Sequence, residues 1–137
     1  MYLQKLIIHE LSTLYLEGAT RAKSEGWWLF DAPSWFYQGY QEYLAIELGP
    51  DEQRDEIWNR LREHAGDCPE FEAADPTPCD DYIDGALLLK FMHERWGDDT
   101  LQTLLSRQEP TFEESLENAL EIDESRLFEA WKSWLER

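Results

Sequence analysis

A histidine and a glutamate stand side by side in "IIHELSTLYL", residues 7–16. A neutral imidazole is a good zinc ligand, and a nearby carboxylate can take a proton from a zinc-bound water. In the helical motif His-Glu-x-x-His, two imidazoles one turn apart hold the metal and the glutamate is the base. Here His9 and Glu10 fill the first two places, but Thr13 stands where the second histidine would be. Only one imidazole is left for a metal.

A second segment, "PSWFYQGYQEYL" at residues 33–44, strengthens the comparison with zinc hydrolases. Together the two segments resemble the gluzincin-type metallopeptidases, in which Glu-Gly-x-x-Glu-Tyr-Leu supplies the third ligand. Gln38 takes the place of that ligand glutamate, and Glu42, one turn further on, would reach the metal only if the helix slid. The resemblance continues through "YIDGALLLKFMHERWGDDTLQTLL" and "LFEAWKSWL", and it places Tyr82 near the site. Because only eight residues precede His9, we expect the sheet that comes before this helix in the family to be absent.

The two replacements weaken any metal site, because Thr is a poor donor and Gln is an uncharged amide. We therefore predict a catalytically degenerate metallopeptidase-like protein that acts by binding a protein or peptide, with no cofactor. In this prediction Thr13 and Gln38 provide the hydrogen bonds that a buried His9 requires without metal. The alternative is a zinc-dependent hydrolase in which Glu10 is the general base and the other ligands are unidentified or come from a second chain.

A second set of metal-binding residue types follows the spacing H-x3-C-x10-C-x13-H: His64, Cys68, Cys79 and His93. This spacing lacks the tight C-x2-C pairs of structural zinc sites. Two free thiols are the first expectation for Cys68 and Cys79, and a disulfide that closes the loop is the second.

Aromatic residues crowd the segment around residues 27–43, and aromatic side chains build both cores and interfaces. We expect most of them in the core and only Trp27 and Trp28 partly exposed, in a loop over the former active-site cleft. The predicted binding cleft consists of Trp27, Trp28, Trp35, Gln38, Glu42 and Tyr82.

The charge of the chain limits its partners. Twelve Lys and Arg against 30 Asp and Glu give a formal charge of −18, while 42% of the residues are hydrophobic, so the chain is acidic and still able to fold. This charge repels nucleic acid and anionic membranes. A further alternative is an acidic decoy that binds a basic partner. Because acidic side chains come too early for a signal peptide, we expect a cytoplasmic protein.

The positions of glycine, proline and apolar residues predict one all-α domain over residues 1–137, resembling the helical half of a gluzincin. Seven helices are expected, and Thr111 and Glu114 of "TFEE" form a capping box. The first helix, residues 2–17, is apolar nearly all round, so we expect it to be central and mostly buried and to end at Gly18. The missing sheet also favours a homodimer, since an exposed apolar helix face would need covering.

Overall fold

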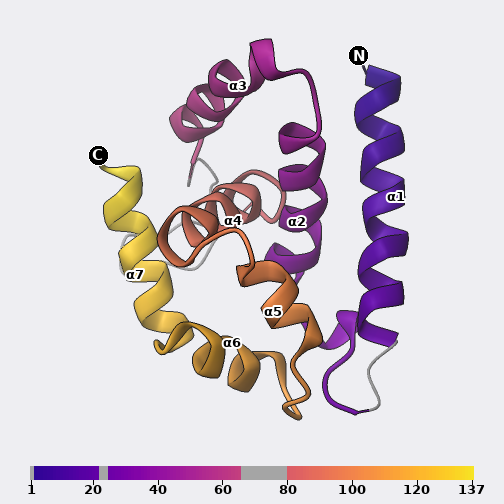
Figure 1. The fold of residues 1–137 in the computed structure, drawn as a ribbon. Helices are drawn as coiled ribbons and strands as arrows, with labels where there is room; N and C mark the ends of the chain where they lie inside the picture. Colours follow the sequence, from indigo (N-terminus) through magenta and orange to yellow (C-terminus); the bar gives the residue numbers. More distant parts are fainter. Residues whose placement is uncertain (1, 22–24, 66–79) are drawn as a thin grey trace.

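The computed structural model describes residues 2–21, 25–65 and 80–137, which form an all-helical fold without a strand (Figure 1). The predicted all-α class is therefore confirmed. A short 3-10 turn, η1 (Leu29–Asp31), precedes α2. Within these described ranges the seven α-helices are α1 (Tyr2–Arg21), α2 (Ser34–Glu47), α3 (Asp51–Glu63), α4 (Ile83–Trp96), α5 (Thr100–Ser106), α6 (Phe112–Leu120) and α7 (Glu124–Leu135).

The centre of the fold is the crossing of α2 with α4, and two glycines allow these helices to touch. A Cβ atom added to Gly39 would lie 2.4 Å from the backbone carbonyl carbon of Gly85. A Cβ atom on Gly85 would lie 2.3 Å from the carbonyl oxygen of Trp35. The contact between the two backbones therefore leaves no room for a side chain at either position.

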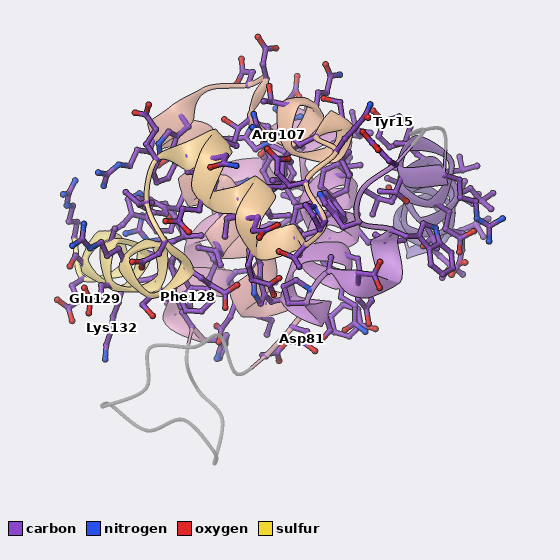
Figure 2. All side chains as sticks on the ribbon, turned by 90° about the horizontal axis from the view of Figure 1, so that it is seen from below. Tyr15, Asp81, Arg107, Phe128, Glu129 and Lys132 are labelled. Atoms are coloured by element: carbon purple, nitrogen blue, oxygen red, sulfur yellow. The ribbon has the colours of Figure 1, made fainter. Side chains whose placement is uncertain are left out.

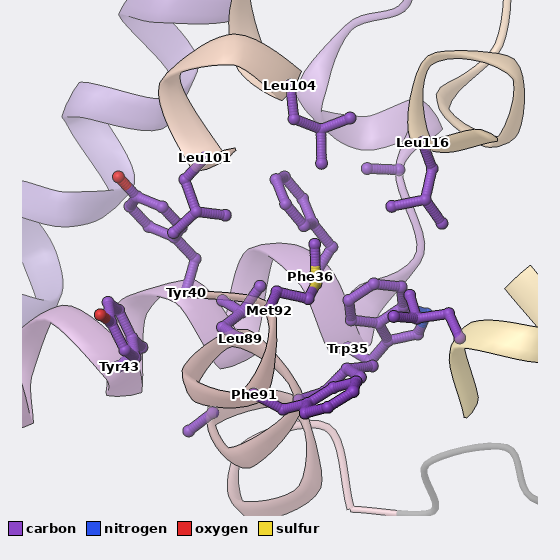
Figure 3. Packing of buried hydrophobic residues seen from close by; sticks show 14 of the residues in the cluster. Trp35, Phe36, Tyr40, Tyr43, Leu89, Phe91, Met92, Leu101, Leu104 and Leu116 are labelled. Atoms are coloured by element: carbon purple, nitrogen blue, oxygen red, sulfur yellow. The ribbon is translucent and has the colours of Figure 1, made fainter. Parts of the chain in front are cut away.

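Around this crossing the core is aromatic and aliphatic (Figure 3). The middle of α4 is buried on every side, and residues 86–89 and Met92 have no exposed surface. From α2, Trp35 and Phe36 point into the same cluster, where Phe112 of α6 packs against Phe36 with 4.8 Å between ring centroids. Helices α5, α6 and α7 close the core around α4 (Figure 1).

Helix α1 lies at the edge of the molecule and packs against α2 (Figure 1). Among the side chains of α1 that the structure describes, the buried ones are Ser12, Leu16 and Thr20, one turn apart. The prediction that this helix is central and mostly buried is wrong, because its leucines and isoleucine on the other side remain exposed. The apolar pattern predicted the helix correctly, but a helix with no clear polar face does not show which side meets the core.

Local signals fix several helix ends as the sequence predicts. The Thr111 hydroxyl accepts the Glu114 backbone N–H at 3.2 Å, which caps α6 and confirms this half of the predicted capping box. The return bond from the Glu114 side chain stays a prediction. Gly97 ends α4 with a φ of 104°, a conformation that favours glycine. Gly18 behaves differently from the prediction, because α1 continues through it to Arg21. The Thr20 hydroxyl then donates to the carbonyl of Leu16 at 3.0 Å.

A polar network holds the segment between α5 and α6 against the loop that carries Trp27. The Glu109 carboxylate accepts from Nε of Arg107 at 2.7 Å and from its terminal nitrogen. It also accepts from the Ser115 hydroxyl at 2.7 Å, and Ser115 in turn accepts the indole N–H of Trp27 at 2.8 Å. The Arg107 hydrogen bond, with those of Ser115 and Asn118, lowers the pKa of Glu109 from 4.5 to about 2.

We expect Glu109→Gln to destabilise the fold by about 1 to 2 kcal/mol at neutral pH, a value reduced because Arg107 is one-third exposed. Since the folded-state pKa lies below the ordinary value, the contribution is complete above pH 4.5 and is lost as pH falls from 4.5 to about 2. Urea unfolding at neutral and acidic pH checks this expectation. Glu117→Gln, on the exposed side of α6, is the control. An equal loss at both pH values would contradict the carboxylate as the cause.

Candidate functional site

Of the predicted metal positions, the structure places Thr13 at the contact between α1 and α2. Thr13 is half-buried there, and its hydroxyl oxygen accepts the side-chain N–H of Gln41 at 2.7 Å. Gln38 is half-buried on α2, and Glu10 is exposed on α1. His9 belongs to α1, but its side chain lies outside the described residues, so its predicted hydrogen bonds stay a prediction.

Gln41 is the residue at this contact that sequence reasoning missed. It is buried, three residues after Gln38, and it bonds to Thr13 across the two helices. The signal available in the sequence was the pair of glutamines one turn apart on α2. The resemblance drew attention to the first glutamine, while the structure shows the second as the partner of Thr13.

The Thr13 hydroxyl takes part in a hydrogen bond between the two helices, since its oxygen accepts an amide N–H from Gln41. Among the described residues, no group of three or more His, Cys, Asp or Glu side chains is placed to hold a metal ion. The Thr13–Gln41 bond instead satisfies two polar groups within a helix interface.

Two of the six residues of the predicted cleft are part of the core. Trp27 is 1% exposed and Trp35 is 4% exposed, so the prediction that Trp27 stays partly exposed is wrong. Its indole N–H is satisfied inside the protein by Ser115, which allows full burial. Trp28 is half-buried as predicted, with the Arg21 guanidinium 5.2 Å from its ring centre.

The remaining cleft residues, Gln38, Glu42 and Tyr82, lie on α2 and just before α4. Glu42 is half-buried and Tyr82 is exposed. Because Trp27 and Trp35 face the core, the six residues do not line one open cleft.

The second predicted metal set is described only in part. His64 ends α3 and is exposed, whereas Cys68 and Cys79 lie outside the described residues. His93 stacks on Tyr43, with 4.7 Å between the ring centroids and 14° between the planes. Burial lowers the pKa of His93, which favours the neutral imidazole in this stack.

The most unusual surface of the molecule is the side of α1 that faces away from α2, which we call the α1 outer face. Its large apolar residues are between 43% and 66% exposed. They recur at spacings of three and four, so they form one continuous stripe along the helix. The α1 outer face consists of Leu3, Leu6, Ile7, Leu11 and Leu14.

A groove of about 350 Å³ runs beside this stripe, between α1 and α2. From α1 it is lined by Ile8, Leu11, Ser12 and Tyr15. From α2 it is lined by Tyr40, Leu44 and Leu48. Tyr15 also borders a smaller hollow of about 190 Å³ against α5. The outer face and the groove share Leu11, so together they make one apolar surface that wraps round α1.

The groove has an apolar lining that stays uncharged. Burial, followed by the neighbouring Tyr15, raises the pKa of Tyr40 to about 12, so its phenol is neutral at physiological pH. Leu48, at the end of α2, is 62% exposed and extends the apolar surface beyond α1. Such a surface suits an apolar side chain of a partner rather than a charged substrate.

Comparisons with known proteins give no relative for this chain. No family model, no curated protein and no solved structure matches it. The gluzincin resemblance therefore stays a prediction from the sequence. None of the helices in the described ranges is both long and apolar enough to cross a membrane.

Proposed function

We propose that this protein acts by binding another protein, with the α1 outer face and its groove as the contact surface. The observation that carries the proposal is the exposure of five leucine and isoleucine residues on one helix. Large contiguous apolar patches on soluble proteins commonly mark interaction sites. The metallopeptidase-like sequence is compatible with this proposal, because the loss of metal ligands leaves binding as the activity.

Peptides selected from a random displayed library against the purified protein test this proposal. We expect the selected peptides to lose at least tenfold in affinity when Leu11 and Leu14 are both replaced by glutamate. Because both side chains are more than half exposed, the free energy of unfolding of the double variant should differ from that of the wild type by no more than about 0.5 kcal/mol per site.

The matched control for charge is Ser133→Glu, an exposed position on α7, which lies on the opposite side of the fold from α1 (Figures 1 and 2). This variant should bind the same peptides as the wild type. Peptides that bind the Leu11→Glu/Leu14→Glu variant unchanged would contradict the proposed contact surface.

A further inference from the structure

The partner of this surface can be defined more closely, an inference that rests on the proposed function. We infer that the partner is a basic amphipathic helix, with its apolar side on the α1 outer face and its Lys or Arg residues toward the carboxylates of Glu10 and Glu17 on α1.

The shape of the surface favours a helix. α1 spans 20 residues, which is about 30 Å, and its exposed apolar residues follow helical spacing along most of that length. The backbone groups of α1 and α2 are used within the helices, so the surface offers no strand edge to an extended peptide. A ridge of side chains beside a groove is the geometry in which a second helix packs.

The charges beside the surface favour a basic partner. Glu10 lies one turn before Leu14 and Glu17 lies one turn after it, so by helical spacing two carboxylates lie on the same side of α1 as the stripe. Arg21, the cation of α1 whose side chain the structure describes, lies at the end of the helix beyond the apolar residues, with its guanidinium over the ring of Trp28.

The charge of the whole chain acts in the same direction. With a formal charge of −18, the protein attracts cationic segments and repels a second copy of itself. Electrostatic complementarity then selects the partner and speeds association, while the apolar stripe provides the contact that holds it.

The test uses fluorescent amphipathic peptides of about 18 residues, long enough to match α1. One peptide places leucines on one helical side and lysines on the other, a second replaces every lysine by glutamate, and a third scrambles the lysine peptide. We expect the amphipathic lysine peptide to bind at least tenfold more tightly than either of the others, and its affinity to fall as salt is raised.

Two sets of variants separate specific docking from general attraction to an acidic protein. Leu11→Glu with Leu14→Glu adds negative charge, so general attraction predicts tighter binding of the lysine peptide, whereas docking on α1 predicts at least tenfold weaker binding. Glu10→Lys with Glu17→Lys should weaken the lysine peptide and strengthen the glutamate peptide. Ser133→Glu should change neither.

The outcomes distinguish this inference from the proposed function. If the glutamate or scrambled peptide binds as tightly as the lysine peptide, and the leucine variants abolish that binding, the surface is a binding site but its partner is not a basic helix. If the leucine variants have no effect on any peptide, both proposals fail. If sedimentation shows a dimer that the leucine variants dissociate, the occupant is a second copy and the basic helix is overturned.

Discussion

Replacing Gly39 by alanine should destabilise the protein by about 3 kcal/mol, a lowering of the melting temperature by about 10 °C. Alanine favours a helix over glycine by about 1 kcal/mol, so helix propensity alone would predict the opposite sign. The clash outweighs it, because the new Cβ would lie 2.4 Å from a backbone atom of Gly85 and α2 and α4 would have to separate. Thermal unfolding followed by circular dichroism measures the change.

Gly18→Ala is the matched control within the same protein. Gly18 is also inside a helix, but a Cβ atom there meets nothing within 4 Å. This substitution should raise stability by about 0.5 to 1 kcal/mol. Gly85→Ala should behave like Gly39→Ala, since its Cβ would lie 2.3 Å from the carbonyl of Trp35. Equal melting temperatures for Gly39→Ala and Gly18→Ala would show that the close crossing of α2 and α4 is wrong.

The sequence predicted the helices well because their signals are local. Thr111 caps α6 and Gly97 ends α4 through groups within a few residues, so each signal can be recognised in the sequence alone. The contact of Gly39 with Gly85 joins positions 46 residues apart, since 85 − 39 = 46. No local pattern states which two helices meet there, and the structure was needed to show it.

At the candidate site, too, the sequence predicts the helices but not the contacts between them. The sequence placed Thr13 and Gln38 on two neighbouring helices, and α1 and α2 are in contact. The partner of Thr13 is nevertheless Gln41, because helix rotation decides which residue faces the neighbour. Gln38 and Gln41 are three residues apart and point in directions that differ by roughly 60° about the axis of α2, a difference that a motif comparison does not reveal.

The exposed face of α1 follows from the same physical limit. Hydrophobic periodicity predicts a helix, and the buried side of that helix is inferred from which side is more apolar. In α1 most sides carry apolar residues, so this comparison does not identify the buried side. The rule that apolar residues face inward predicts burial for such a helix, and this rule fails for surfaces that bind a partner. The exposed apolar residues that make the predicted burial of α1 wrong are thus the same residues on which the proposed function rests.

The adjacent tryptophans 27 and 28 should differ sharply when each is replaced by alanine. Trp27→Ala should cost about 3 to 5 kcal/mol, because it empties a fully buried site. The ring packs edge-on against Phe112, with 5.2 Å between centroids, and against Phe36, with 6.1 Å. The substitution also removes the N–H that Ser115 accepts.

Trp28→Ala should cost only about 1 kcal/mol, since Trp28 is half-buried and its ring lies beside the Arg21 guanidinium near the surface. Urea unfolding of both variants compares the free energy lost at a core tryptophan with that lost at its neighbour in the same loop. Similar losses for the two would mean that Trp27 is not the anchor between this loop and α6. A large loss for Trp27→Ala alone would support that anchor, which holds η1 and the start of α2 beside the end of α1.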